Sequence, residues 1–279
     1  MNLAEQVRDI EPQVRASPWT GHEHYRGYAV LALPFSSGHL LGLRVFPEND
    51  FAPYKSIWHR TPEGDWSIYN DGPSLRTTCP RWWGPALEHA ELASFQLTWT
   101  GPNRLRVEME EPALAWTMSM TAPPLLRVLN AVTAALPLWT WKPALQQRIA
   151  EWMAKWLLGL GDVPFSFVTP SQQSAILVPE RQFFIDSSQA TWQGRDLGEP
   201  VELDENPTIG QVRLPTRPTF VIGQAHARIP DLEEYREARE LVGAEGPHQP
   251  NSNRIQPKPS QIATNSRSSR SSVVLYSLV

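Results

Sequence analysis

The feature of the sequence that most restricts its fold is a succession of short apolar runs between residues 25 and 122, each bounded by Gly, Pro, Asn or Ser. Polar and apolar side chains alternate within these runs, which is the period of a β-strand. The breaks, such as Gly101-Pro102-Asn103, have the composition of tight turns. The predicted strands are 25–34, 39–47, 54–61, 65–71, 92–101, 103–111 and 113–122. This part of the chain therefore predicts an antiparallel sheet made of hairpins.

The stretch KSIWHRTPEGDWSIYND, residues 55–71, is predicted to form one of these hairpins. Pro62-Glu63-Gly64 provides the turn, because Gly tolerates the backbone conformations that short loops need. Successive side chains of a strand point to opposite faces. We therefore expect Trp58 and Arg60 on one face of the sheet and His59 on the other.

The period of the apolar residues changes at residue 123, where two helices are predicted, 123–137 and 142–161. Prolines precede each helix, and Gly159 and Gly161 end the second. Its apolar stripe consists of Leu145, Ile149, Trp152, Met153, Trp156 and Leu157. We expect this stripe to pack against the sheet. The alternative is that the helical hairpin, 123–160, makes peripheral contact with a membrane or acts as a lid.

Strand patterns resume after the helical hairpin, and a charged helix is predicted over 231–242. The later predicted strands are 163–169, 174–188, 190–200, 209–216 and 219–229. Roughly ten or more strands are enough for an antiparallel barrel or a sandwich. We expect one mainly β domain over 1–242, with the helical hairpin inserted. Residues 243–279 are rich in Ser, Asn, Gln and Pro, and are expected to be disordered.

The composition gives no indication of nucleic-acid binding, of an internal disulfide, or of a metal site. The net charge is −4 and the charged fraction is 19%, which does not favour nucleic acid as a partner. Cys79 is the single cysteine, so no internal disulfide can form, and no Cys/His spacing indicates a metal site or a bound cofactor. No signal-peptide pattern or membrane-spanning run is present, and a cytoplasmic protein is expected.

Two groups of residues are candidates for a functional site. His59 could act as a general acid or base, helped by Asp71 or Arg60; alternatively these are ordinary polar residues of a hairpin. Trp82 and Trp83 are adjacent in a loop and could line the mouth of an apolar pocket, or close one end of a barrel.

Four stretches carry a resemblance to known proteins: IWHRTPEGDW, WWGPALEHAEL, LTWTGPNRLRVEME and DSSQATWQGRDLGEP. Over about residues 25–230 the chain resembles a family of uncharacterised bacterial β-rich proteins. More distantly, its layout of strands is similar to the lipocalin-like superfamily that includes hydroxyneurosporene synthase, the AttH proteins and fungal Diels-Alderases of that fold. The resemblance implies a β-barrel or sandwich that encloses an apolar cavity.

The resemblance and the tryptophans together predict binding of a lipophilic small molecule inside the barrel. The candidate wall residues are Trp58, Trp66, Trp82, Trp83, Trp99 and Trp116. An alternative is an enzyme without a cofactor that hydrates, isomerises or cyclises a terpenoid or polyketide, with His59 as acid or base. A third is a scaffold that binds a protein partner through Trp152 and Trp156 of the helical hairpin.

Overall fold

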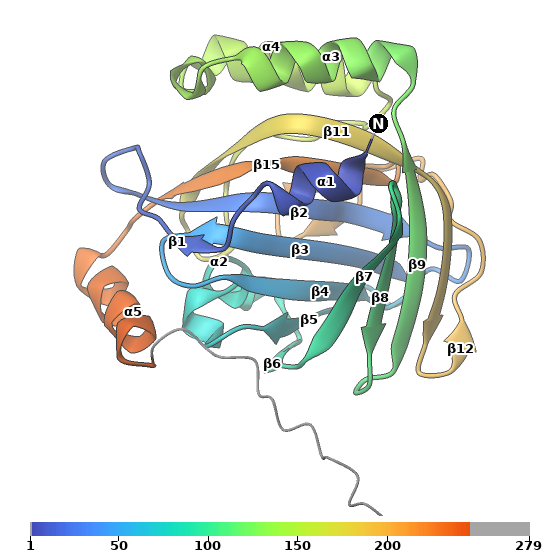
Figure 1. Cartoon of the computed structure of the whole chain (residues 1–279), viewed down its shortest axis with the longest axis horizontal. Coiled ribbons are helices and arrows are strands. Elements are labelled where there is room, and N and C mark those ends of the chain that lie inside the picture. The colour runs from blue at the N-terminus through green and yellow to red at the C-terminus, as the bar shows by residue number, and fades with distance from the viewer. Residues whose placement is uncertain (1, 246–279) are drawn as a thin grey trace, which may run out of the picture. The chain divides into compact units, whose positions relative to one another are not determined.

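We describe the fold from a computed structural model, in which residues 2–245 are placed. A thirteen-stranded mixed sheet dominates it (Figure 1), and a separate two-stranded ribbon is formed by β13 and β14. The strands are β1 (Gln13–Val14), β2 (His22–Pro34), β3 (Leu40–Asn49), β4 (Tyr54–Arg60), β5 (Trp66–Asp71), β6 (His89–Leu92), β7 (Phe95–Gly101), β8 (Arg104–Met109), β9 (Leu114–Thr121), β10 (Ser166–Val168), β11 (Ser174–Trp192), β12 (Arg195–Asp196), β13 (Thr208–Ile209), β14 (Val212–Arg213) and β15 (Thr219–Arg228). The predicted mainly β fold is confirmed.

Five α-helices and three short 3₁₀ turns lie around the sheet in the described part of the chain. They are α1 (Leu3–Arg8), α2 (Pro80–Trp83), α3 (Pro124–Ala135), α4 (Ala144–Trp156) and α5 (Leu232–Glu245), with short 3₁₀ turns η1 (Leu75–Thr77), η2 (Gly84–Ala86) and η3 (Leu138–Trp141). The two helices predicted between β9 and β10, and the one predicted over 231–242, are confirmed. In the placed part of the chain, no helix is both long and apolar enough to cross a membrane. The segment predicted to be disordered, 243–279, lies outside the described residues except for the last turn of α5.

The main path of the sheet runs in the order β6-β5-β4-β3-β2-β15-β11-β9-β8-β7. Its neighbours are antiparallel except for β5 and β6. The path curls so strongly that β7, β8 and β9 cross in front of β2 to β5 (Figure 1). It forms a half-barrel, because within residues 2–245 its end strands β6 and β7 do not pair with each other.

The long strand β11 makes much of this curl. It pairs with β15 as far as Phe184 and with β9 from Phe184 onward, and irregular register interrupts both ladders. Such bulges bend a strand and increase its twist. Gly27 and Gly223 face each other across β2 and β15, and a Cβ on Gly27 would lie 1.9 Å from the carbonyl oxygen of Val45. Only glycine at position 27 allows β2 to approach β3 this closely.

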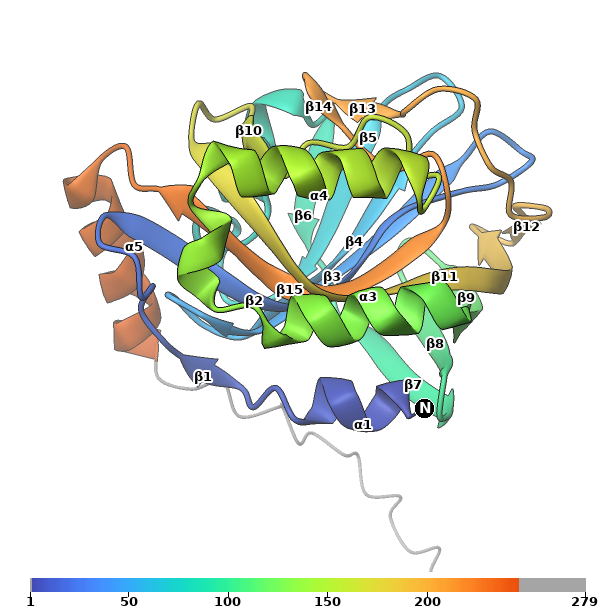
Figure 2. The ribbon, with the colours of Figure 1, turned by 90° about the horizontal axis from the view of Figure 1, so that it is seen from above.

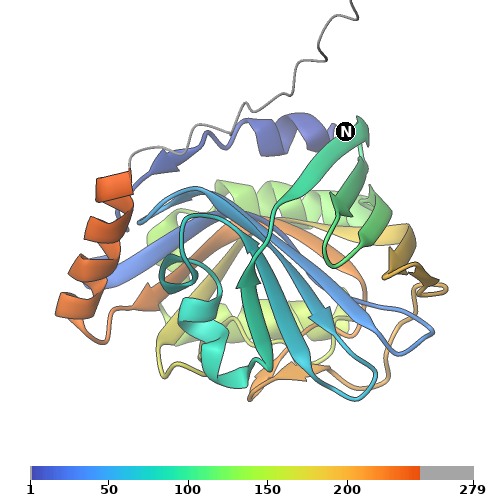
Figure 3. The same cartoon turned by 90° about the horizontal axis from the view of Figure 1, so that it is seen from below.

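The larger core covers the inner, concave face of the sheet, and it also includes Leu126, Trp141 and Phe165 from α3, η3 and the segment after α4. Side chains from β3 and β4, such as Leu43 and Ile57, share it with Val107 and Trp116 from β8 and β9 at the other end of the path. The N-terminal segment lies along the open side of this core, next to β7 (Figure 3), and inserts Leu3 and Val7. The concave face is therefore filled mainly by the sheet itself.

The outer face of β2 to β5 carries a second core, which segments of little regular structure cover. Trp58 and Ile68 from the sheet contact Trp82 and Trp83 of α2, and Ile209 and Leu214 from the segment around β13 and β14. Figure 2 shows β10, β13 and β14 on this side of the sheet, and α1 with β1 on the opposite side. Strands β2 to β4 are thus buried on both faces.

The expectation that the stripe of α4 packs on the sheet is wrong. Leu145 is 70% exposed and Trp156 is 67% exposed, whereas Gln147 and Ala154 are buried. The buried side of α4 is held by polar contacts: Gln147 donates to the carbonyl oxygen of Trp141, and Glu151 accepts from the backbone N–H of Phe165. Periodicity identified the apolar face of the helix but not the direction in which it points.

Candidate functional site

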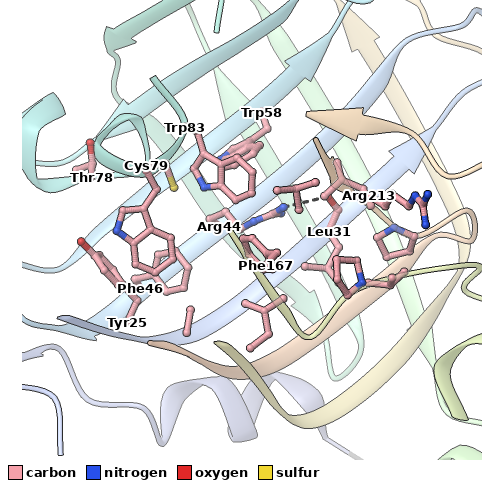
Figure 4. Close-up of a pocket in the computed structure, with 18 of the residues that line it drawn as sticks. Tyr25, Leu31, Arg44, Phe46, Trp58, Thr78, Cys79, Trp83, Phe167 and Arg213 are labelled. Carbon is pink, nitrogen blue, oxygen red and sulfur yellow. Dashed lines mark hydrogen bonds between the residues drawn. The ribbon is translucent and has the colours of Figure 1, made fainter. Parts of the chain in front are cut away.

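An apolar cavity lies on the outer face of the sheet, between β2 to β4 and the segments that cover them (Figure 4). Its volume is about 680 Å³ with the open mouth included. Seven aromatic side chains line it: Tyr25, Phe46, Tyr54, Trp58, Trp82, Trp83 and Phe167. Val163, Leu177 and Leu214 complete much of the wall, so the cavity is suited to an apolar molecule.

A second cavity, of about 670 Å³ with its open mouth included, adjoins the first over β15 and β11. Val178, Pro179 and Gln182 of β11 form one wall, and Leu160 and Phe165 from the segment after α4 form another. The residues shared by both linings are Leu31, Arg44, Phe46, Val163, Leu177 and Ala225. The two cavities are therefore neighbours, and Arg44 belongs to the wall that they share.

Arg44 of β3 is a buried charge in this apolar site, only 7% exposed. Its guanidinium lies over the ring of Trp58, 4.5 Å from the centroid. Nη1 donates to the carbonyl oxygens of Val30 and Leu43, and Nη2 donates to that of Leu31 at 3.0 Å. The pairing of β2 with β3 is irregular between Val30 and Leu33, which leaves carbonyl oxygens free to accept these bonds.

The positive charge of Arg44 has no carboxylate beside it in the described structure. The ion pairs formed within residues 2–245 do not include Arg44, and no acidic side chain lines either cavity. Burial lowers the pKa of Arg44 to about 10, so the group remains protonated at neutral pH. A buried charge that is compensated only by backbone dipoles is costly, and a negatively charged ligand would reduce that cost.

The guanidinium also has donors to spare. Three of its five N–H groups bond to carbonyl oxygens, and no acceptor for Nε–H or for the second Nη2–H occurs among the described residues. These two N–H groups are left to donate to a ligand, and donation from a guanidinium to a carboxylate is a strong, charge-assisted hydrogen bond.

Helix α2 is attached to the sheet by a buried ion pair at the edge of the cavity. Nε of Arg81 lies 2.9 Å from Oε2 of Glu23, and both side chains are almost completely buried. Glu23 also accepts from Trp82 and Gln173. Burial raises the pKa of Glu23, although Arg81 and these hydrogen bonds oppose the shift. The pair positions the Trp82 and Trp83 wall over β2.

Cys79 lies in the wall of the first cavity but is not an activated thiol. Its Sγ is 3.2 Å from Oγ of Ser56 and 3.5 Å from the hydroxyl of Tyr54. Burial raises the pKa of the Cys79 thiol, which keeps it neutral. No group of three or more His, Cys, Asp or Glu side chains within residues 2–245 is placed to hold a metal ion.

The structure brings three of the six candidate tryptophans together. Trp58, Trp82 and Trp83 line the first cavity. Trp66 lies behind Trp58, with the ring centroids 6.2 Å apart, and donates to the carbonyl oxygen of Thr208. Trp99 and Trp116 belong to the core of the concave face and line neither cavity.

The three candidate catalytic residues lie in separate places. His59 is buried on the concave face, where it stacks on Trp192 at 4.1 Å and hydrogen-bonds to His39 at 2.9 Å. Burial, with His39 as a smaller cause, lowers the pKa of His59 to about 4. Asp71 pairs with Lys55 at the far end of β4 and β5, at 2.7 Å. Arg60 is half-buried on the opposite face from His59, as the strand alternation predicts. His59 lines neither cavity, so its catalytic role stays a prediction.

Arg44 is the site residue that sequence reasoning did not identify. It stands in the apolar run HLLGLRVFP, in register with Leu40, Gly42 and Phe46 on one face of the strand. A single charge inside an apolar strand is a usable signal, since such a residue is seldom buried without a partner. The same pattern also fits an exposed position on a strand with one solvated face.

Comparison with known family models, curated proteins and solved structures finds no match for this chain. The β-rich half-barrel is the part of the expected resemblance that the structure bears out. Membership of the lipocalin-like superfamily stays a prediction.

Proposed function

We propose that the protein binds a lipophilic small molecule that carries an acidic group. The apolar part of the ligand would lie against Trp58, Trp82 and Trp83, and its acidic group would pair with Arg44. The observation that carries this proposal is the unpaired Arg44 guanidinium in the wall that two apolar cavities share. The site differs in position from the barrel interior expected from the sequence, because it lies on the outer face of the sheet.

The site supports both halves of such a ligand. The walls of the two cavities are apolar with few polar groups, which is the usual lining of a site for an apolar small molecule. The two free N–H groups of Arg44 can donate charge-assisted hydrogen bonds to a carboxylate. Because the surroundings exclude water, the charge attraction is stronger than at an exposed site.

The first experiment compares acids with uncharged ligands of the same shape. Long-chain and aromatic carboxylic acids and their methyl esters would be titrated against the protein, with calorimetry and thermal unfolding as readouts. We expect an acid to raise the unfolding temperature in proportion to its affinity, and its ester to bind more weakly. Equal binding of acid and ester would refute the charge pairing; no binding of any acid or ester would refute the whole proposal.

The second experiment uses a matched pair of arginines. Arg213 also lines the first cavity but is exposed. We expect Arg44→Met to weaken acid binding by about 10- to 100-fold, the effect of losing a charge-assisted hydrogen-bonded pair. Arg213→Met should change the affinity by less than about threefold. Arg44→Lys keeps the charge but loses the planar guanidinium, so its affinity for the acid should lie between those of Arg44→Met and Arg213→Met. It also serves as a second variant in case Arg44→Met does not fold.

A further inference from the structure

The two helices between β9 and β10 expose an unusually large apolar surface. Of the fourteen large hydrophobic side chains that are exposed in the described residues, nine belong to α3, η3, α4 and the residue after α4. Trp139, Trp152 and Trp156 are 69%, 57% and 67% exposed. Scattered exposed hydrophobic side chains are normal, but a concentration of this kind marks a surface that binds a protein or a membrane.

This orientation of the helices is fixed by specific contacts on their buried side. Asn130 of α3 donates to the carbonyl oxygen of Gln182 and accepts from its backbone N–H, both at 2.8 Å. Thr133 donates to the carbonyl oxygen of Glu180 at 2.7 Å. Glu151 of α4 accepts from the N–H of Phe165 at 3.0 Å. Rotating either helix to bury its apolar face would break these bonds.

The exposed surface is also cationic. Residues 124–157 contain four basic side chains, Arg127, Lys142, Arg148 and Lys155, and one acidic side chain, Glu151, in a chain whose net charge is −4. Arg127 and Arg148 are exposed, whereas Nζ of Lys142 lies 5.0 Å from the ring centroid of Trp19, and Lys155 pairs with Asp162 at 2.6 Å. The helical pair therefore has the opposite sign of charge from the rest of the chain.

We infer that α3, η3 and α4 form a docking surface for an anionic lipid membrane. Trp favours the boundary between lipid and water, and Lys and Arg are attracted to anionic headgroups. Helices that lie in a membrane surface combine an apolar face with such cations. Figure 1 shows both helices outside the sheet on one side of the molecule, and Figure 2 shows them running roughly parallel, with strands of the sheet visible between them.

A second copy of this chain fits the surface less well. A symmetric dimer places the same surface on both subunits. The cations of one helical pair would then face those of the other, whereas the anionic headgroups of a membrane would neutralise them. We therefore assign the surface to lipid.

The docking surface adjoins the second cavity. Gln182, whose backbone α3 binds, and Phe165, whose backbone α4 binds, both line that cavity. The docking surface and the second cavity therefore share contacts with residues of β11 and of the segment after α4. The docking surface itself rests on exposure and charge, and is independent of whether any ligand binds.

The test is sedimentation of the full chain with vesicles. Two compositions are used: phosphatidylcholine alone, and equal parts of phosphatidylcholine and phosphatidylglycerol. We expect binding to the mixed vesicles, with weaker binding to phosphatidylcholine. Removing two cations in Arg127→Gln/Arg148→Gln should weaken binding to the anionic vesicles by about 25-fold, about fivefold for each charge. It should leave the binding to phosphatidylcholine within about twofold.

The apolar part of the contact is tested with Trp152→Gln/Trp156→Gln. We expect at least a tenfold loss of binding to both kinds of vesicle. Because both side chains are exposed, the thermal unfolding temperature should not fall. The matched control is Leu92→Gln, an apolar side chain of β6 with 53% exposure, which should bind as the unaltered chain does.

Two results would overturn the inference. One is the absence of binding to the anionic vesicles. The other is a stable dimer in light scattering that Trp152→Gln/Trp156→Gln converts to a monomer, which would assign the surface to a second copy of the chain.

Discussion

The two faces of strands β2 to β4 are both buried, but they are covered in different ways. The concave face is filled by side chains from the sheet's own distant strands and from α1. The outer face is covered by α2 and by two segments, around 157–173 and 199–216, that contain little regular structure. Both cavities described above lie on the outer side, next to Arg44.

The difference follows from how closely each cover can follow the sheet. A sheet that curls onto itself brings strands of matching twist together, and their side chains interdigitate at the density of a normal core. The outer segments are attached at a few polar points, such as Glu23 with Arg81, and Asn206 with the carbonyl oxygens of Leu160 and Leu214. Between such points the cover does not fill the space.

The largest expected effect is on the free energy of unfolding, when one tryptophan on each face of the sheet is replaced by alanine. Trp116 on the concave face is 1% exposed and donates to Oγ of Ser188, so Trp116→Ala should lower the free energy of unfolding by about 3–5 kcal/mol. Trp83 already borders a cavity, and Trp83→Ala should cost about 1–2 kcal/mol because fewer packing contacts are lost. Urea unfolding measures both. Equal losses would show that the outer face is packed as tightly as the inner one.

A second prediction concerns the pH dependence of the concave face. The pKa of His59 is lowered to about 4 by burial, whereas an unfolded His titrates near 6.5. The unfolded chain therefore binds more protons, so stability is complete above about pH 6.5 and is lost as the pH falls toward 4. His59→Phe keeps a ring against Trp192 and removes this proton uptake.

We expect the loss of stability between pH 6.5 and 4 to be about 3 kcal/mol smaller in His59→Phe than in the unaltered chain. Urea unfolding at a series of pH values checks it. His226, with a pKa lowered to about 3, remains in both proteins and contributes equally to each. Parallel stability curves for the two proteins would contradict the prediction.

The smallest predicted effect is on the outer cover. Asn206 accepts from the N–H of Asp162 at 2.8 Å and donates to the carbonyl oxygens of Leu160 and Leu214. Asn206→Ala should cost about 1–2 kcal/mol, since these bonds are partly solvated. Limited proteolysis should show faster cleavage within 157–216. Asn206→Asp keeps the acceptor but places a carboxylate oxygen against the carbonyl oxygens of Leu160 and Leu214, so cleavage should be at least as fast as in Asn206→Ala. No change in cleavage in either variant would mean that packing alone holds the cover.

Local elements of the fold could be predicted from the sequence where turn chemistry is explicit. Pro62-Glu63-Gly64 predicted the β4–β5 hairpin, and Gly64 indeed has a positive φ of 111°. The Gly101-Pro102-Asn103 break predicted the β7–β8 hairpin. The pairing of β2 with β15, nearly two hundred residues apart, could not be predicted, because long-range order depends on packing between whole elements.

The candidate site was predicted only in part. Trp58, Trp82 and Trp83 were identified as wall residues, since large aromatic side chains gather in apolar sites. Trp99 and Trp116 have the same chemistry but lie on the concave face of the sheet. The alternation of side chains along a strand does not predict which of the two faces borders a cavity. The direction of the α4 stripe was missed for a related reason: periodicity describes one helix, whereas burial depends on what surrounds it.

Burial on both sides has a consequence for how the strands find their alignment. In a strand with one wet face, a slip of one residue moves apolar side chains into water and is strongly disfavoured. In β4 the same slip would exchange Ile57 with Trp58, and both positions are apolar and buried. Hydrophobicity therefore selects the alignment only weakly, and the selection falls to features that fit a single alignment: the close approach at Gly27, and the bonds from Arg44 to Val30 and Leu31. Arg44, at the centre of the candidate site, therefore also helps to fix the register of the strands in the middle of the sheet.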